Sequence, residues 1–265
     1  QVKYDYLNGA REIRQSADGQ HDLIVALDAS DMQRLGNVFV PALHARLPIV
    51  VFDHHVTNTL FGAVNVIEPN VSSTSELVLK LIRRLGLTLT PDIAAALLTG
   101  LVTDSLAFRT SNTTPDTLAA AMELMKTGVS LAEITRKSLV LRSYDSLKFM
   151  AAGILASQME DGIAWACITR KLRRETGTRE DRGDGNLVGT LITAMEARIA
   201  AVFVENADGT IEIGFRSAPG YDVSQVAFEL GGGGHPAAAG CTIPGPMRDA
   251  VNRVLPRLRQ VIREA

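Results

Sequence analysis

The sequence has few of the features that mark secreted, membrane-embedded or nucleic-acid-wrapping proteins. Its two cysteines, Cys167 and Cys241, are far apart and show no metal-type spacing, which argues against a disulfide framework and against a thiolate metal site. No apolar run approaches the ~20 residues that cross a bilayer, and no basic start precedes an apolar segment. The formal net charge is -2, so no overall basic field attracts nucleic acid. We therefore expect a cytoplasmic protein without membrane contact.

The chain also lacks an initial methionine and an obvious leading strand. It begins with Gln1 and continues as QVKYDYLNGA, a stretch without the apolar run of a buried strand. We therefore expect that the natural protein begins earlier and that a further segment precedes Gln1.

What the sequence does contain is an alternation of apolar runs and helical patterns. The 265 residues are 46% hydrophobic, enough for one large domain or two ordinary ones. The runs at 21–30 and 49–52 are rich in Ile, Val and Leu and predict buried strands of a parallel sheet. Ser73 and Glu76 predict a capping box at the start of a helix. This order is typical of an α/β fold, and helices are predicted at 72–86, 90–105 and 114–128.

The second half of the chain has a different pattern. Residues 130–157 stay helical, and the part from Arg142 predicts a connector helix. Beyond it we expect a strand at 162–169, a hairpin around Asn206–Gly209 and a final amphipathic helix from Met247. The predicted architecture is a parallel-sheet domain joined by the connector helix to a smaller α/β domain, over residues 1–141, 142–157 and 158–265.

Acidic and imidazole side chains follow the two predicted strands. Asp28 ends the first run, the second ends in Asp53, His54 and His55, and Asp104 ends a buried helix. Open α/β sheets bind ligands at the carboxyl edge of their strands, so we expect these groups to meet there. Carboxylate oxygen and imidazole nitrogen suit Mn²⁺ or a similar divalent ion, and two such ions ~3.5–4 Å apart can clamp a phosphate.

Each of these residues also has a simpler explanation. Asp28 or Asp104, taken singly, is explained at least as well as a helix cap or a turn residue. A single histidine on an apolar segment is more often a core or surface residue. The triplet at 53–55 differs, because three ionisable groups at the end of an apolar run are costly to bury without a function.

A second group of residues lies in GGGGHPAAAG at 231–240. Four glycines allow backbone conformations in which several N–H groups point inward and bind an anion, and His235 adds a side-chain donor. Upstream, Arg216 and Ser217 end a predicted hairpin strand, where arginine can bind a phosphate with two hydrogen bonds. A flexible loop with an incidental histidine explains the same residues, and the sequence alone leaves both interpretations open.

The triplet DHH after a buried strand resembles the signature of the DHH phosphoesterase superfamily. VALDAS (25–30) is similar to the aspartate motif that precedes it, and GLVTDS (100–105) to the one that follows. The resemblance implies that Asp28 bridges two Mn²⁺ ions and that His54 and Asp104 bind one of them. It further implies that Asp53 orients an imidazole and that His55 faces the scissile phosphate. The superfamily's first motif, a histidine followed by two aspartates, is not found in residues 1–19.

The glycine segment extends the resemblance to almost the whole chain. FRS followed by DVSQVAFELGGGGHPAAAG is similar to the C-terminal DHH-associated domain, whose glycine–histidine motif binds the nucleotide part of the substrate. The resemblance therefore implies a substrate-binding role for Arg216, Ser217, Gly232, Gly233, Gly234 and His235.

DHHVTN, SSTSEL and FRTSNTTP are most similar to the nanoRNase and phosphoadenosine-phosphate phosphatase branch of the superfamily. Arg109 and Asn112 in the last of these are candidate substrate contacts, with surface roles equally compatible. The resemblance implies hydrolysis of short oligoribonucleotides to mononucleotides, with removal of the 3′-phosphate of phosphoadenosine phosphate as a second activity. A homodimer is compatible with the many apolar helices. Hydrolysis of cyclic di-adenylate or linear dinucleotides stays open, as does a non-catalytic nucleotide-binding module if the upstream metal motif is absent.

Overall fold

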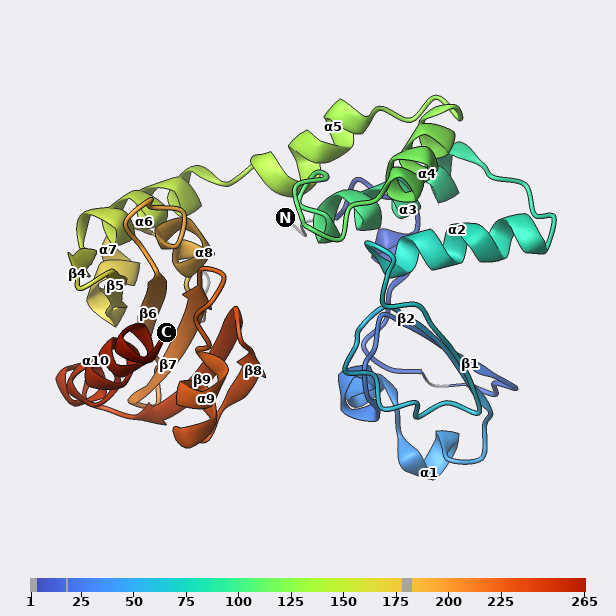
Figure 1. Cartoon of the computed structure of the whole chain (residues 1–265). Helices are drawn as coiled ribbons and strands as arrows, with labels where there is room; N and C mark the ends of the chain where they lie inside the picture. The colour runs from blue at the N-terminus through green and yellow to red at the C-terminus, as the bar shows by residue number, and fades with distance from the viewer. Residues whose placement is uncertain (1–3, 18, 178–182) are drawn as a thin grey trace. The chain divides into compact units, whose positions relative to one another are not determined.

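The chain folds into two compact units, residues 1–141 and 142–265, each with its own sheet and core (Figure 1). The computed structural model describes residues 4–17, 19–177 and 183–265. We expected no leading strand at the start of the chain, and residues 1–3 of that stretch lie outside these ranges. Residues 4–17 contain the short 3₁₀ turn η1 (Ala10–Glu12) and no strand. Within the described ranges, no helix is long and apolar enough to cross a bilayer.

The first unit contains a parallel sheet with the strand order β1–β2–β3 in its described residues. In the register, Leu27 lies opposite Phe52 and Asp53 lies opposite Ile67. The parallel pair predicted from the two apolar runs is therefore confirmed. The strands and the elements of the first crossover are β1 (Ile24–Leu27), η2 (Met32–Val38), α1 (Pro41–His44), β2 (Ile49–Asp53) and β3 (Val64–Ile67).

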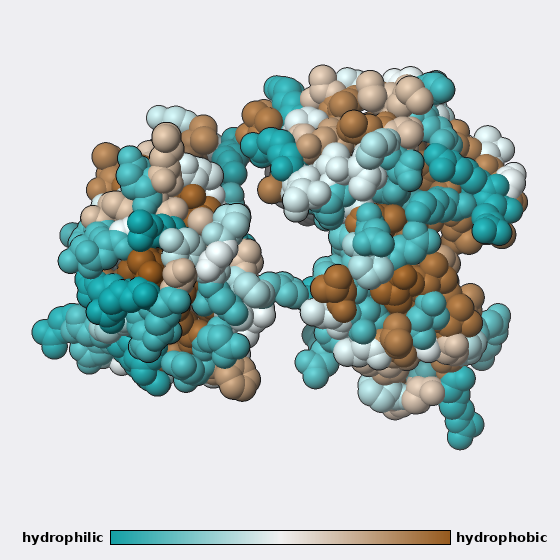
Figure 2. Space-filling model, in the orientation of Figure 1, coloured by the Kyte–Doolittle hydropathy of each residue, from teal (hydrophilic) through white to brown (hydrophobic). Residues whose placement is uncertain are grey.

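The prediction that both strands are buried is right for β2 and wrong for β1. Val25 and Leu27 of β1 are 52% and 51% exposed, whereas Ala26 between them packs against Ile49 and Val51 of β2. Successive side chains of a strand point to opposite faces, so one face of β1 is buried and the other is open among the described residues. Figure 2 shows apolar side chains gathered on this part of the first unit. An apolar run therefore does not require two covered faces.

The helices of the first unit form a separate core. Leu79, Leu98, Leu101 and Leu124 lie at its centre with almost no exposed surface. Threonine hydroxyl groups cap α3 and α4, and proline follows each cap at the first helical position, where its missing N–H costs nothing. The helices are α2 (Thr74–Arg84), α3 (Pro91–Asp104), α4 (Pro115–Met125) and α5 (Leu131–Thr135).

The capping box predicted between Ser73 and Glu76 at the start of α2 does not form. Ser73 makes no side-chain cap bond. The buried carboxylate of Glu76 instead accepts hydrogen bonds from the N–H and the hydroxyl of Ser72 and from the hydroxyl of Thr117. Because it lies near the N-termini of both α2 and α4, the carboxylate is favoured by two helix dipoles. This second attraction comes from residues 41 positions away and is not readable from the local motif.

The continuous helix predicted over 130–157 is interrupted. α5 continues into a π-helical turn, η3 (Arg136–Val140), and Leu141 and Ser143 then have extended backbone before α6 (Tyr144–Leu155) begins. The hydroxyl of Ser143 accepts the N–H of Ser146 and so caps a new helix. The boundary between the two units falls at this break.

The second unit is a mixed sheet covered by helices on both faces. α9 (Ser224–Glu229) and α10 (Met247–Glu264) pack on one face, and α6 and α8 (Leu187–Leu191) on the other. The helix predicted as a connector, α6, thus contributes Phe149 to this core. The predicted hairpin of β6 and β7 is confirmed. In the described residues the strand order is β4 (Gln158–Glu160), β5 (Ile163–Ile168), β6 (Ile199–Glu205), β7 (Thr210–Ser217), β9 (Ala238–Pro244) and β8 (Gly233–His235), and α7 (Arg170–Glu175) follows β5.

Candidate functional site

The carboxyl ends of β1 and β2 bring the predicted acidic and imidazole residues to one edge of the first sheet. Asp28 follows β1 directly, and its N–H donates to the carbonyl oxygen of Phe52 at 3.0 Å. Its φ of 60° is left-handed, a conformation that aspartate tolerates better than most residues. The Oδ1 atom of Asp28 accepts a hydrogen bond from the hydroxyl of Thr74 at 2.8 Å. The carboxylate is therefore fixed between a strand end and the start of α2.

His54 lies between two carboxylates. Its Nδ1 atom is 3.3 Å from the carbonyl oxygen of Val71, which can only accept, so a neutral ring carries its proton on Nδ1. Its Nε2 atom lies 3.5 Å from Oδ1 of Asp28 and 3.8 Å from Oδ2 of Asp104. A nitrogen lone pair that faces two carboxylates requires a cation between them or a proton on Nε2.

His55 is oriented by the buried carboxylate of Asp53. Its Nδ1 atom lies 2.7 Å from Oδ1 of Asp53, which also accepts the N–H of His54 at 2.8 Å. Burial raises the pKa of Asp53, but the hydrogen bonds from His55 and Asn58 and the charge of His55 outweigh it, so the pKa lies below the ordinary 3.8. Asp53 thus stays ionised and holds one ring nitrogen, which leaves Nε2 of His55 without a hydrogen-bond partner in the described part of the chain.

Asp104 is the last residue of α3 and faces the same group. Burial raises the pKa of its carboxyl, and the charge of Asp28 raises it further, whereas His54 and His55 lower it. Two carboxylates this close repel each other unless a cation is shared between them. The electrostatics of Asp104 therefore favour a bound cation.

Together these residues have the donor chemistry of a divalent-cation site. Asp28, His54 and His55 each offer one ligand atom, and these atoms lie within 4.8 Å of one another. Asp104 adds a carboxylate next to His54. Carboxylate oxygen with imidazole nitrogen suits several divalent ions of the first transition row. The residues that the structure brings together therefore fit a metal ion.

Arg109 follows Asp104 after an unusual turn. Leu106, Ala107 and Phe108 all have positive φ, of 47°, 58° and 65°, which is costly for residues with a Cβ atom. The hydroxyl of Ser105 supports the turn by donating to the carbonyl of Leu101 and accepting the N–H of Phe108. The exposed Arg109 side chain donates through Nε to the carbonyl of Leu106 at 2.8 Å. The described residues show no contact between Arg109 and the candidate metal ligands.

Asn112 lies in the same loop. Its Oδ1 atom is buried and has no hydrogen-bond partner within the described ranges. Among the described residues, no hydrogen bond of this oxygen explains the place of Asn112 in the motif.

Arg216 and His235 lie on the same face of the second sheet. In the register, Ala238 of β9 lies opposite Arg216 of β7 on one side and opposite His235 of β8 on the other. Residues directly opposite each other in antiparallel strands point to the same face. With neighbouring strands ~4.8 Å apart, the two side chains stand ~10 Å apart across the small side chain of Ala238.

Ser217 holds this end of the sheet together. Its hydroxyl lies 2.7 Å from the carbonyl oxygen of Tyr221 and 3.0 Å from that of Pro236, and its N–H donates to Ala237. The Nη1 atom of Arg216 donates to the carbonyl of Phe215 at 2.8 Å. Ser217 therefore ties β7 to the turn that follows His235.

The glycine segment forms a strand and a tight turn, which excludes the alternative of a flexible loop. Gly233–His235 pair with β9 as β8. A Cβ atom on Gly232 would lie 2.1 Å from the carbonyl oxygen of Gly240, and one on Gly234 would lie 2.5 Å from that of Ala238. The backbone at Gly232 and Gly234 thus approaches β9 too closely for side chains at these two positions. Gly233 differs, because a Cβ atom there would meet nothing within 4 Å.

Two residues that hold the metal candidates in place had no role in the sequence interpretation. Thr74 donates to Asp28, and Asn58 donates through Nδ2 to Oδ2 of Asp53 at 2.6 Å. Both lie inside the motifs DHHVTN and SSTSEL, which is the one signal that the sequence offers for them. Their partners are set by the pairing of strands and helices and are not readable from local spacing.

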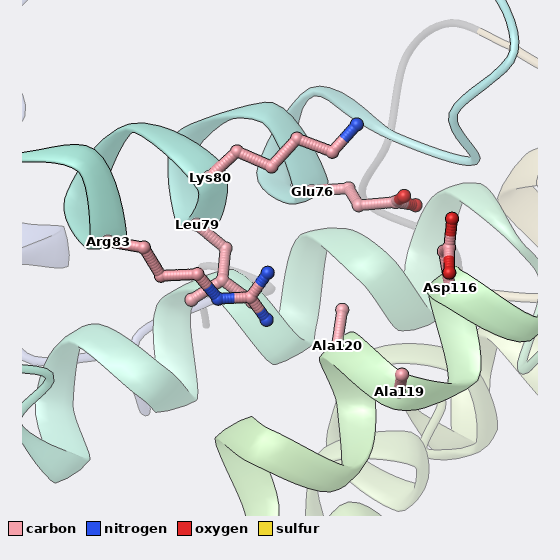
Figure 3. Close-up of a pocket in the computed structure, with 7 residues that line it drawn as sticks. All are labelled: Glu76, Leu79, Lys80, Arg83, Asp116, Ala119 and Ala120. Carbon is pink, nitrogen blue, oxygen red and sulfur yellow. The ribbon is translucent and has the colours of Figure 1, made fainter.

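A hollow of about 250 Å³ lies between α2 and α4 (Figure 3). Figure 3 shows the carboxylates of Glu76 and Asp116 turned toward each other at one end of it. None of the candidate metal ligands lines this hollow, whose walls are formed by Glu76, Leu79, Lys80, Arg83, Asp116, Ala119 and Ala120.

Two family descriptions match the chain. "DHH family, N-terminal domain" matches residues 2–101, and "DHHA1 domain" matches residues 181–264. The first match contains Asp28 and the triplet at 53–55, and it ends just before Asp104. The second contains Arg216 and the glycine segment.

Curated proteins and a solved structure are similar over most of the chain. The "Bifunctional oligoribonuclease and PAP phosphatase NrnA" of Thermus thermophilus is 35% identical over 91% of this chain and 72% of that protein. The protein of the same description from Bacillus subtilis is 28% identical over 91% of this chain and 76% of that protein. An exopolyphosphatase-related protein from Bacteroides fragilis has a similar fold, with a TM-score of 0.82 at 24% identity over 90% of this chain and 71% of that chain.

Proposed function

Because the chain belongs to the DHH family and carries both its N-terminal domain and a DHHA1 domain, we propose that it is a metal-dependent phosphoesterase that hydrolyses short oligoribonucleotides to mononucleotides. The description of the relatives from Thermus thermophilus and Bacillus subtilis supports this substrate, and it supports removal of the 3′-phosphate of phosphoadenosine phosphate as a second activity. The observation that carries the proposal is the convergence of Asp28, His54 and His55 at one sheet edge.

In the proposed site, Asp28, His54 and Asp104 hold the metal, and we take Mn²⁺ as the ion. When bound, divalent ions of this kind lower the pKa of water to near neutrality and offset the charge of a phosphate. Thr74 keeps Oδ1 of Asp28 in place, and the carbonyl of Val71 holds the His54 ring in the tautomer that presents Nε2 to the ion. Hydrogen bonds within this chain thus orient the ligand atoms in the metal-free protein.

His55 is the residue that we expect to face the scissile phosphate. The hydrogen bond between Nδ1 and Asp53 orients the ring and leaves Nε2 for the substrate. When both ring nitrogens carry protons, the Nε2–H group can donate to a phosphoryl oxygen and stabilise charge that develops there. A fixed donor of this kind needs no reorganisation during the reaction.

The second unit supplies the proposed nucleotide-binding surface. Arg216 and His235 stand on one face of the sheet with Ala238 between them, and Arg216 offers a planar donor group for a phosphate or a base. Gly233 leaves open space beside His235 for close approach of the ligand to the backbone. Ser217, Gly232 and Gly234 hold the turn and the strand pairing that support these groups. Arg109 in the first unit is a further proposed contact.

Incubation of the full-length protein with dinucleotide RNA and Mn²⁺ tests the proposed activity. We expect mononucleotides as products, and we expect His54→Ala to lower kcat about 100-fold or more, since a ligand is lost, without a change of fold. His21→Ala is the matched control, because this exposed ring lies beside His44 and away from the candidate ligands. The absence of mononucleotide from the wild-type protein, or full activity of His54→Ala, would contradict the proposal.

A further inference from the structure

The side chain of Asn58 lies at the junction of the loops that follow β1 and β2. Its Nδ2 group donates to Oδ2 of Asp53 at 2.6 Å and to the carbonyl of Ala29 at 3.1 Å, while its Oδ1 atom accepts the N–H of Leu60 at 2.8 Å. Both Nδ2 protons and the side-chain oxygen are used, so the network itself assigns the orientation of the amide.

The contacts of Asn58 reach both loops that carry candidate metal ligands. Ala29 directly follows Asp28, and Asp53 directly precedes His54. The neighbouring Thr59 extends the connection, because its N–H donates to the carbonyl of Ser30 at 2.8 Å and its hydroxyl to the same oxygen at 3.2 Å. Residues 58–59 are thus fastened to residues 29–30.

The hydrogen bonds that join the two loops set the distances between the candidate metal-ligand atoms. Nε2 of His54 lies 3.5 Å from Oδ1 of Asp28 and 3.8 Å from Oδ2 of Asp104. Two ligands can share one ion only while their donor atoms stay within about twice a metal–ligand bond of each other, and such bonds are ~2.0–2.2 Å long. A shift of about 1 Å of either loop would therefore weaken the site.

We propose that Asn58 is a positioning residue of the metal site. Its hydrogen bonds hold the loop after β1 and the loop after β2 in a fixed relative position, so that Asp28 and His54 can bind the same ion. Through Asp53 it also fixes the ring of His55. The inference rests on the metal-dependent function proposed above. Asn58 touches neither metal nor substrate in this role, and it acts through the groups that do. Residues that hydrogen-bond to metal ligands and orient them typically change metal affinity about 10- to 100-fold when they are substituted.

A matched control is available at the start of β3, where Asn65 holds the end of the same connection. Asn65 also makes three side-chain hydrogen bonds to backbone groups: Nδ2 to the carbonyls of Gly62 at 2.8 Å and Leu60 at 3.4 Å, and Oδ1 to the N–H of Gly62 at 3.0 Å. None of these bonds reaches Asp28, Asp53 or the two histidines. Loss of either asparagine should destabilise the connection, so a change in stability does not distinguish a residue that only holds the connection from one that positions the metal ligands. A change in metal affinity does distinguish them.

The experiment is a calorimetric titration of the metal-free full-length protein with Mn²⁺, for the wild type, Asn58→Ala and Asn65→Ala, with thermal unfolding in EDTA. We expect Asn58→Ala to raise the Kd for Mn²⁺ about 10- to 100-fold, and Asn65→Ala to leave it within about twofold. We expect the rise of Tm on adding Mn²⁺ to shrink in Asn58→Ala only. Should Asn58→Ala not fold, Asn58→Ser keeps a small polar side chain but loses both amide donors, and the same rise of Kd is expected.

Two results would overturn the inference. One is an Asn58 variant that binds Mn²⁺ as tightly as the wild type, and the other is an equal loss of affinity in Asn65→Ala. A wild-type protein that binds Mn²⁺ but hydrolyses no dinucleotide would contradict the proposed function. The role of Asn58 in metal binding would then still be decided by the Kd values from the titration. A wild-type protein that binds no Mn²⁺ would overturn the metal site and the inference together.

Discussion

The Nδ1 atom of His55 lies 2.7 Å from Oδ1 of Asp53, a carboxylate with no exposed surface. The same carboxylate accepts the N–H of His54 and the amide of Asn58, so it has three donors and no contact with solvent. A strand that ends in three ionisable groups is costly unless such a network satisfies them. β2 therefore ends with a buried anion that organises the two histidines beside it.

Replacing Asp53 by asparagine should destabilise the protein in a pH-dependent way. Hydrogen bonds to a charged acceptor are lost, and we expect the free energy of unfolding at pH 7 to fall by about 1.5–3 kcal/mol. The pKa of Asp53 is lowered in the folded state, so its contribution is complete above the ordinary value of 3.8 and is lost as the pH falls through the lower folded value. Urea unfolding in EDTA from pH 7 to pH 3 measures this difference.

Asp22→Asn is the control for that series. Asp22 is exposed, so its substitution should leave the free energy of unfolding within ~0.5 kcal/mol at every pH. A difference between wild type and Asp53→Asn that stays constant down to pH 3 would show that the charge of Asp53 does not matter.

Asp104→Asn should have the opposite effect on the metal-free protein. Burial and the charge of Asp28 raise the pKa of Asp104, so its ionised form is disfavoured by folding. The variant should be more stable than the wild type at neutral pH in EDTA, with an advantage that fades as the pH falls through the raised pKa and is gone below 3.8. Saturating Mn²⁺ should reverse the order, because the variant lacks a ligand. Differential scanning calorimetry with and without Mn²⁺ tests both halves, and an unchanged order would contradict the ligand role.

The extent to which the sequence predicts the fold differs between its elements. The parallel pair of β1 and β2 and the hairpin of β6 and β7 follow from apolar runs and turn residues. The exposed face of β1, the break at 141–143 and the strand β8 do not, because each depends on packing or on a competing cap. Gly232 and Gly234 illustrate the difference. The two glycines are also compatible with an anion-binding loop, and the β9 residues whose close approach requires them lie eight and four positions further along the chain.

The candidate site shows the same division. Residue types at two strand ends indicated Asp28, His54 and His55 as a group, because the carboxyl edge of a parallel sheet collects them, and Asp104 was added as the end of a buried helix. The partners that orient them, such as Thr74 for Asp28 and the carbonyl of Val71 for His54, come from the start of α2 and the segment before it, and local spacing does not show which group each one contacts. The identity of the ion, the substrate contacts and the homodimer stay predictions.

The turn after Asp104 should be stabilised by glycine. Ala107 has a φ of 58°, and a left-handed residue with a Cβ atom costs roughly 1–2 kcal/mol, which exceeds the ~0.5–1 kcal/mol that glycine loses in conformational entropy. We expect Ala107→Gly to raise the free energy of unfolding by about 0.5 kcal/mol. Ala119→Gly, in the exposed interior of α4, should lower it by about 0.5–1 kcal/mol. Equal losses in the two variants, measured by urea unfolding, would show that the turn is not strained.

Alanine substitutions at two neighbouring glycines separate the folding role of the glycine segment from its proposed binding role. Gly234 has a φ of 141° and a Cβ position only 2.5 Å from the carbonyl of Ala238, so Gly234→Ala should disrupt the pairing of β8 with β9 and lower the free energy of unfolding by about 2 kcal/mol or more. Gly233→Ala has open space around the new methyl group and should leave the unfolding free energy within ~1 kcal/mol. If the ligand approaches the backbone at Gly233, however, the methyl group occupies that space. We then expect Gly233→Ala to raise KM for dinucleotide RNA several-fold with little change in kcat, as loss of uniform binding does. An unchanged KM in a folded Gly233→Ala protein would place the nucleotide elsewhere and leave the segment with the folding role alone.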